Sequence, residues 1–240
     1  MEQIIVKGIV LRAIDYGEKD KIVTILTEDR GKLTVILKGV KKASARMKFA
    51  SQPFCYAEFT LTGKSELRTV IGAVEVESFF GIVHSYQRIV AGSAILEMTE
   101  QISNFGESNL ILFNALKKAL RVLTLDDFAP DLVLMRFALG VFKISGYEMN
   151  LKTCRNCGKL LSTDLAIFDV VSGEFNCIQC PVERFIQVSP RAVELMQKMV
   201  KVDFEDLAGV EILDEEAKEF RQIIRTNFEI RFGVALKSLG

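Results

Sequence analysis

The stretch KIVTILTEDRGKLTVIL, residues 21–37, decides the fold of the N-terminal third of the chain. It contains two runs rich in Val, Ile, Leu and Thr, residues 21–27 and 32–37, on either side of the polar segment from Glu28 to Gly31. β-branched residues favour strands, and a short polar segment that ends in glycine favours a turn. The stretch therefore predicts two strands joined by a turn.

Three more runs of this kind surround the first two, at residues 4–14, 53–61 and 67–77. The last two are separated by a second turn-like segment, residues 62–65. Five short strands within about 75 residues fit a small closed or partly open barrel better than a sandwich. We therefore expect a five-stranded OB-fold barrel over residues 1–78.

The same region contains a cluster of positive charge. The whole chain has 31 basic and 31 acidic residues, yet none of the residues from Arg30 to Ala57 is acidic. A basic surface of this kind is typical of contact with nucleic-acid phosphates. Nearby aromatic residues could stack on bases, but in strands they more often pack in or against the core, which we expect for Phe54, Tyr56 and Phe59. The cations of the segment are Arg30, Lys32, Lys38, Lys41, Lys42, Arg46 and Lys48.

Motifs for catalysis are not recognisable in the sequence. Gly63-Lys64-Ser65 resembles the end of a phosphate-binding loop, but that motif needs a glycine where this chain has Glu58. The one histidine, His84, has no recognisable catalytic grouping, and no His-Glu-x-x-His is present. No apolar run reaches the length of a membrane span, and the N-terminus lacks a secretory pattern. We expect a non-enzymatic, cytoplasmic protein.

After Ser78 apolar residues recur at helical spacing. Residues 132–144 are apolar at so many positions that their helix should be surrounded by others. Ser189-Pro190 and the acidic residues 214–216 are start signals for two more helices. The last helix carries a stripe of Phe220, Ile224, Phe228 and Phe232, while Arg221, Arg225 and Arg231 complement its dipole and leave contact with DNA undecided.

Two Cys-x-x-Cys pairs, Cys154/Cys157 and Cys177/Cys180, flank a hairpin-like stretch around Ser172-Gly173. Four thiolates on two tight turns can enclose a Zn²⁺ ion tetrahedrally, and such a closed site is structural because it leaves no position for a catalytic water. Two disulfides or a redox pair are the alternatives, but disulfides require an oxidising compartment. We expect a small local core around Leu160, Leu165, Ile167 and Phe168, and a buried Cys55 in the barrel.

These features give a multi-domain α+β architecture, in which an α-helical bundle with an inserted four-cysteine zinc hairpin follows the barrel. The expected domains are residues 1–78 (barrel), 79–150 (first helical part), 151–186 (zinc module) and 187–240 (second helical part).

Four N-terminal segments, KGIVLR (7–12), DYGEKDKIV (15–23), GKL (31–33) and KGVKK (38–42), closely resemble the N-terminal domain of the bacterial RecO recombination mediators. The resemblance extends over nearly the whole chain, from the barrel through the helices to the cysteine hairpin and terminal helix. By position it adds Arg12, Lys19 and Lys21 to the residues expected to face DNA.

The resemblance implies a DNA repair protein that binds single- and double-stranded DNA and anneals complementary strands without ATP. It also implies three partners: RecR, the acidic C-terminal tail of the single-stranded DNA-binding protein and, indirectly, RecA. Two rival functions remain, an RNA- or polymerase-binding factor with a zinc ribbon, and a metal-dependent nuclease. The nuclease would need clustered carboxylates with open metal positions, which the sequence does not offer.

Overall fold

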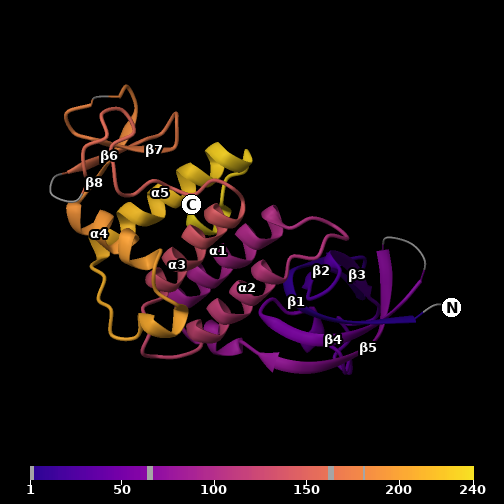
Figure 1. The fold of residues 1–240 in the computed structure, drawn as a ribbon. Coiled ribbons are helices and arrows are strands. Elements are labelled where there is room, and N and C mark those ends of the chain that lie inside the picture. The colour runs from indigo at the N-terminus through magenta and orange to yellow at the C-terminus, as the bar shows by residue number, and fades with distance from the viewer. Residues whose placement is uncertain (1–2, 64–66, 162–164, 181) are drawn as a thin grey trace. The chain divides into compact units, whose positions relative to one another are not determined.

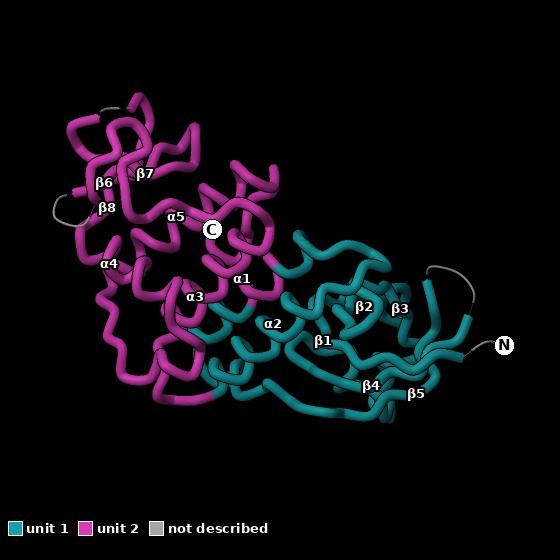
Figure 2. Tube along the Cα trace, in the orientation of Figure 1, with its two compact units in different colours: residues 1–92, 99–124 teal, residues 93–98, 125–240 magenta. Residues whose placement is uncertain are grey.

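The computed structural model describes residues 3–63, 67–161, 165–180 and 182–240 (Figure 1). The chain divides into two compact units, one of residues 1–92 and 99–124 and one of residues 93–98 and 125–240 (Figure 2). The first unit contains strands β1 (Gln3–Tyr16), β2 (Asp20–Thr27), β3 (Gly31–Leu37), β4 (Cys55–Thr62) and β5 (Leu67–Ser78), and helix α2 (Leu110–Leu123). Helix α1 (Tyr86–Ile102) contributes to both units. The second unit contains helices α3 (Pro130–Ile144), α4 (Pro190–Met199) and α5 (Asp214–Phe232), and strands β6 (Ala166–Asp169), β7 (Glu174–Cys177) and β8 (Phe185–Val188).

Strands β1 to β5 form a closed barrel in the order β1-β2-β3-β5-β4. Neighbouring strands are antiparallel except β3 and β5, which run parallel where residues 34–36 pair with residues 67–69. Because side chains alternate between the two faces of a strand, every second residue points into the barrel, and most of these residues are apolar. This interior includes Val10, Val23, Ile25, Val35, Cys55, Ala57 and Phe59. The predicted five-stranded OB-like barrel is confirmed.

A segment between β3 and β4 closes one end of the barrel. Residues 38–48 lead into a short 3₁₀ helix, residues 49–51, whose Ala50 is buried in the barrel core together with Val40. The strand directions place the β1–β2 turn at this same end. The β2–β3 turn and the first residues of β1 lie at the opposite end.

Helix α2 packs on the outside of the barrel within the first unit. The rings of Tyr56 and Phe113 meet edge to face with centroids 5.8 Å apart, and the Tyr56 hydroxyl donates to the Glu28 carboxylate. Burial and this hydrogen bond raise the pKa of Tyr56. Arg121 donates to both oxygens of Glu77 at 2.8 and 2.6 Å, and this pairing lowers the pKa of Glu77. The aromatic residue Tyr56 is therefore part of the packing.

Helix α3 is the centre of the second unit, because nine of its side chains are buried, from Leu132 to Phe142. This confirms the prediction of a surrounded helix. On α5 the predicted stripe is buried at Phe220, Ile224 and Phe228, whereas Phe232 is half-buried and stacks on Phe142 with ring centroids 6.3 Å apart.

The predicted helix starts in the second unit are also confirmed. Ser189 caps α4 by accepting a hydrogen bond from the Ala192 N–H at 3.3 Å, and Pro190 is the first residue of that helix. Helix α5 begins at Asp214, as the acidic triplet indicated.

Strands β7, β6 and β8 form a small antiparallel sheet in that order. The hairpin of β6 and β7 turns at Ser172-Gly173, as predicted, whereas β8 was not predicted. The second turn predicted in the barrel, residues 62–65, lies partly outside the described residues.

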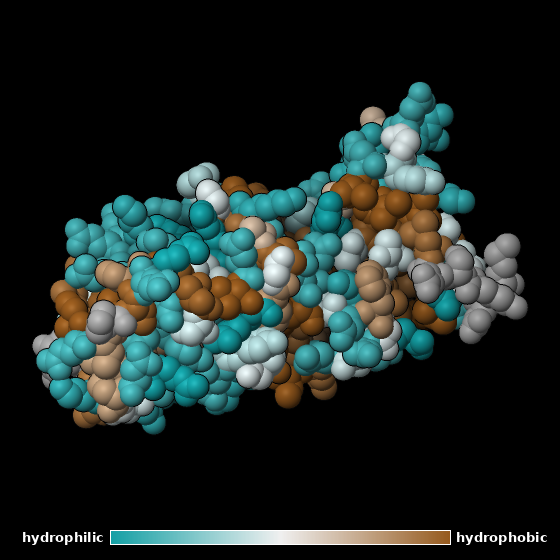
Figure 3. Space-filling model, turned by 90° about the horizontal axis from the view of Figure 1, so that it is seen from above, coloured by the Kyte–Doolittle hydropathy of each residue, from teal (hydrophilic) through white to brown (hydrophobic). Residues whose placement is uncertain are grey.

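The visible face in Figure 3 is mainly hydrophilic, with separate hydrophobic patches between the polar areas. Within the described ranges, no helix combines the length and the apolar character that a membrane span requires.

Candidate nucleic-acid interface and metal site

The closing segment and the β1–β2 turn are joined by hydrogen bonds that bring their lysines together. The Lys41 N–H donates to the carbonyl of Lys19 at 3.0 Å, and the Gly39 N–H donates to the Asp20 carboxylate at 2.7 Å. The Lys41 ammonium lies 2.7 Å from an oxygen of Asp15, which lowers the pKa of that carboxyl group. Two segments separated in sequence thus share one end of the barrel.

We call the cations of this end the basic rim. Most of them are exposed, including Lys41, Lys42 and Arg46, as the sequence predicted. Apart from Lys41, none of them forms an ion pair with another described residue. The rim therefore carries positive charge that is free to meet a polyanion. Its members are Lys19, Lys21, Lys38, Lys41, Lys42, Arg46 and Lys48.

Arg30 and Lys32 lie at the opposite end of the barrel, at the β2–β3 turn. The Lys32 ammonium donates to the carbonyl of Glu100 at 2.6 Å and lies 4.7 Å from the centre of the Phe105 ring. Burial lowers the pKa of Lys32, and the nearby Glu100 offsets part of that effect. Lys32 thus connects the barrel to the end of α1 within the first unit.

The remaining predicted DNA residue, Arg12, lies on β1 with its guanidinium 3.7 Å from the Glu100 carboxylate. Its side chain is 59% exposed, so this pair is weak in water and leaves the cation accessible. Arg30 is similarly placed, 3.5 Å from Asp29. The ten predicted residues therefore form a cluster of seven, with three others apart from it.

Two of the three arginines on α5 are held by acidic residues of the second unit. Arg221 donates to Asp131 at 2.5 Å, and Arg231 donates to Glu174 at 3.1 Å and to the Gly173 carbonyl at 3.3 Å. Arg225 is exposed. These contacts give Arg221 and Arg231 a structural role. Of the two, Arg231 lies in the last turn of α5, where a cation also complements the helix dipole, whereas Arg221 lies too far from that end.

The aromatic residues near the basic segment are core residues, as expected. Phe54, Tyr56 and Phe59 are 6%, 5% and 0% exposed, so none of them offers a ring face to a base. The aromatic residue that is exposed at the rim is Tyr16, the last residue of β1. Sequence reasoning missed it, because the predicted strand ended at residue 14.

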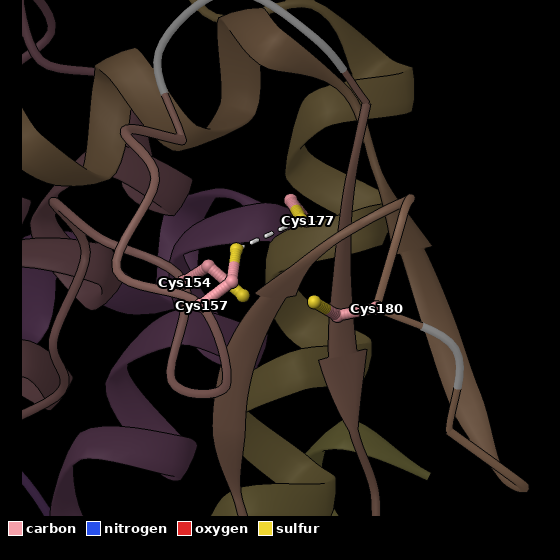
Figure 4. Close-up of side chains that lie close together, drawn as sticks. All are labelled: Cys154, Cys157, Cys177 and Cys180. Atoms are coloured by element: carbon pink, nitrogen blue, oxygen red, sulfur yellow. Dashed lines mark hydrogen bonds between the residues drawn. The ribbon is translucent and has the colours of Figure 1, made fainter.

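The four cysteines of the second unit lie together. Cys154 and Cys157 are on one turn before β6, while Cys177 ends β7 and Cys180 follows on the next turn (Figure 4). Their sulfur atoms all lie within 4.8 Å of one another, and those of Cys157 and Cys177 are 3.7 Å apart. All four are free thiols. A tetrahedral zinc site with Zn–S bonds of about 2.3 Å has sulfurs about 3.8 Å apart, so the arrangement fits a metal ion.

Backbone groups prepare this site for thiolates. Burial opposes ionisation of Cys154, but N–H groups of Cys177, Cys157 and Asn156 point toward its sulfur and lower its pKa to about 6. Hydrogen bonding with Cys157 raises the pKa of Cys180 to about 12, and the charge of Cys154 adds to that rise. Without a metal, Cys154 therefore ionises more readily than Cys180.

The local core of the cysteine module differs in part from the prediction. Ile167 and Phe168 are buried, and Phe168 contacts Phe175 edge to face at 5.2 Å. Leu160 and Leu165 are 70% and 37% exposed, so their assignment to the core was wrong. The turn that carries Leu160 directs its side chain outward, and the neighbouring Leu161 is buried instead.

Cys55 is fully buried in the barrel, as predicted. Burial raises the pKa of its thiol to about 12, so it behaves as a small apolar side chain rather than as a reactive group.

The barrel belongs to a fold class whose members use sheet faces and loops to bind oligonucleotides or oligosaccharides. Family models described as recombination protein O match this chain at residues 1–79, for the N-terminal part, and at residues 83–240, for the C-terminal part. The chain therefore belongs to the recombination protein O (RecO) family.

Curated proteins named DNA repair protein RecO are similar over most of the chain. The Exiguobacterium protein is 30% identical over 97% of this chain and 92% of its own length. The Streptomyces coelicolor protein is 32% identical, covering 82% of each chain. The Bacillus subtilis protein is 29% identical over 97% of this chain and 91% of its own.

Proposed function

We propose that this protein is a DNA repair and recombination mediator that binds single- and double-stranded DNA and anneals complementary strands without ATP. The observation that carries the proposal is the basic rim, seven cations gathered at one end of an OB-like barrel. Annealing brings two polyanions together without reading their sequence. A dense set of lysines does this by replacing the counterions condensed on the phosphates.

The DNA surface of the proposal is the basic rim, and the exposed Arg12 on β1 is a further contact that lies apart from it. Arg30 and Lys32 are left out of its centre, because they lie at the other end of the barrel and Lys32 is engaged within the first unit. The proposed partners act in order. The tail of the single-stranded DNA-binding protein would recruit the protein to coated DNA, and RecR would then help it to load RecA on that DNA. In this proposal the protein acts in the cytoplasm, at the nucleoid during repair, and catalyses no covalent step.

The four-cysteine cluster is proposed to hold a structural Zn²⁺ through Cys154, Cys157, Cys177 and Cys180. The donor set supports this assignment, because four thiolates prefer zinc and leave no coordination position for a reacting water. When bound, the ion would hold the two cysteine turns together. The turn at Gly173 is held separately, by Arg231 of α5.

The test of the proposed function is a strand-annealing assay without nucleotide. Two complementary oligonucleotides are coated with single-stranded DNA-binding protein, and duplex formation is followed by fluorescence with and without the protein. We expect the protein to accelerate annealing at low salt and to lose the effect as salt rises. Annealing at the spontaneous rate at every salt concentration would contradict the proposal, and a preference for RNA in competition would favour the rival RNA-binding function.

Replacing Lys32 by alanine is expected to destabilise the first unit rather than weaken DNA binding. The variant loses a hydrogen bond to Glu100 and a cation–π contact with Phe105, together about 1–2 kcal/mol. Urea unfolding measures the loss, and fluorescence anisotropy with a labelled oligonucleotide should give an affinity within about twofold of the parent.

The matched control is Lys42→Ala, at an exposed rim residue without an ion-pair partner among the described residues. This variant should show the reverse pattern, weaker DNA binding with unchanged unfolding. Weaker DNA binding with normal stability in Lys32→Ala would instead show that Lys32 contacts DNA.

A further inference from the structure

Tyr16 is an exposed aromatic residue at the basic rim. It ends β1, pairs with Asp20 across the β1–β2 ladder, and its side chain is 53% exposed. The next residues form the turn whose Lys19 carbonyl accepts a hydrogen bond from the Lys41 N–H. Tyr16 is therefore fixed at its backbone by a strand and by the closing segment beyond it, while its ring faces solvent.

The charges around Tyr16 suit a polyanion. The acidic residues on and beside this turn are Asp15, Glu18 and Asp20. Two of these carboxylates are engaged, Asp15 by the Lys41 ammonium and Asp20 by the Gly39 N–H. Seven rim cations against three carboxylates leave a net positive charge beside the ring. A phosphate chain drawn to the rim would bring its bases close to Tyr16.

Other exposed rings of the first unit lack this environment. Phe105 is 64% exposed and has the Lys32 ammonium 4.7 Å from its centre, but that ammonium donates to the Glu100 carbonyl. At its end of the barrel the cations Arg12, Arg30 and Lys32 are accompanied by four acidic residues, Glu28, Asp29, Glu100 and Glu107. Tyr86, 81% exposed, begins α1 and lies outside the barrel strands and the turns that carry the basic rim. Tyr16 is thus the described ring in the first unit that combines exposure with a positive neighbourhood.

From this juxtaposition we infer that Tyr16 stacks on an unpaired base of a strand held by the basic rim, and so gives the rim a preference for single-stranded over double-stranded DNA. The inference rests on the proposed DNA binding and assigns a residue to that site. Contacts with phosphates alone would not favour a single strand over a duplex, because both forms of DNA present a phosphate backbone. An exposed ring would, because the bases of a duplex are already stacked on one another and the bases of a single strand are available.

The test compares Tyr16→Ala and Tyr16→Phe with the control Tyr86→Ala, which removes an exposed ring of the same unit elsewhere. Affinities are measured by fluorescence anisotropy for an oligo-dT strand, an abasic strand of equal length and a duplex. We expect Tyr16→Ala to weaken oligo-dT binding about tenfold. Tyr16→Phe and Tyr86→Ala should stay within about twofold of the parent, and abasic and duplex affinities should not change.

A second measurement does not depend on the stability of the alanine variant. The chain contains no tryptophan, so Tyr16→Trp introduces a single tryptophan at the site, which can be excited separately from the remaining tyrosines. Its emission should be quenched when oligo-dT binds and not when the abasic strand binds. Equal quenching by both strands, or equal loss of affinity for all three DNAs in Tyr16→Ala, would overturn the stacking role.

The two levels of the proposal fail differently. A parent protein that binds none of the three DNAs would overturn the proposed function and the stacking role together. A parent that binds oligo-dT with the same affinity as Tyr16→Ala would overturn the stacking role alone.

Discussion

The variant carrying Lys41→Glu, Lys42→Glu and Arg46→Glu is expected to bind single-stranded DNA at least about 100-fold more weakly than the parent at 0.1 M salt. Three exposed cations of the basic rim become anions, which changes the charge facing the phosphates by about six units. If most of the rim contacts phosphates, the parent should show a slope of log affinity against log salt of roughly −3 to −5. The slope of the variant should be smaller by about 2. A salt series in fluorescence anisotropy measures both quantities.

The matched control changes the same amount of charge in the second unit, through Lys143→Glu, Lys198→Glu and Lys201→Glu. These lysines are exposed and belong to or follow helices α3 and α4. The control should keep most of the parent's affinity and its salt slope, which separates the effect of the rim from the effect of net charge. Equal losses in the two variants would show that the rim is not the DNA surface. Urea unfolding of both variants checks that the folds are intact.

The barrel was predictable because its strands are short, rich in β-branched residues and separated by turns that polar residues and glycine favour. The parallel pairing of β3 with β5 was not predictable, since residues 34–36 and 67–69 carry no local signal for each other. The extent of β1 was also missed. Asp15 and Tyr16 continue the ladder because they pair with Lys21 and Asp20, which is a property of the hairpin and not of either residue alone.

The absence of acidic residues between Arg30 and Ala57 predicted a basic surface. It did not predict that the cations of this segment lie at two opposite ends of the barrel. Lys32 and Lys38 are six residues apart in sequence, yet β3 carries them to opposite ends of the barrel. Their different surroundings, a carbonyl of α1 for Lys32 and solvent for Lys38, follow from that strand. Sequence proximity therefore overstated the cluster by including Arg30 and Lys32.

The cysteine set was predictable from its spacing, because two Cys-x-x-Cys turns flanking a hairpin place four sulfurs on one side of it. The contacts that hold the cysteine module within the second unit could not be predicted from the sequence. The backbone at Gly173 has φ +71°, and an added Cβ would lie 2.7 Å from the Asn227 side-chain oxygen. The nearest cation, Arg231, lies 58 residues further along the chain and donates to the Gly173 carbonyl. Such a long-range pair leaves no periodic pattern in the sequence.

Replacing Cys154 or Cys177 by serine is expected to remove bound zinc and to destabilise the second unit by about 4 kcal/mol or more. Three remaining thiolates bind zinc less tightly. Once the ion is lost, little else holds the turn that carries Cys154 and Cys157, because between residues 152 and 161 the buried apolar side chain besides Cys154 is Leu161. Zinc content per chain is measured by atomic absorption after dialysis, and stability by urea unfolding with and without a chelator. The parent should lose stability with the chelator, whereas the variants should not respond to it.

Cys55→Ala provides the matched control, because Cys55 is a buried thiol in the barrel and lies outside the four-cysteine cluster. It should retain the zinc of the parent and lose only the packing of one sulfur atom, about 1 kcal/mol. The Cys154 variant should in turn keep most of its affinity for single-stranded DNA at temperatures where the barrel is folded, since the basic rim belongs to the first unit. A Cys154→Ser protein that keeps a full zinc complement, or one that loses zinc and unfolds like the parent, would contradict a structural role for the metal. If DNA affinity instead fell in proportion to the zinc content while the barrel stayed folded, the cysteine module would be part of the DNA-binding surface.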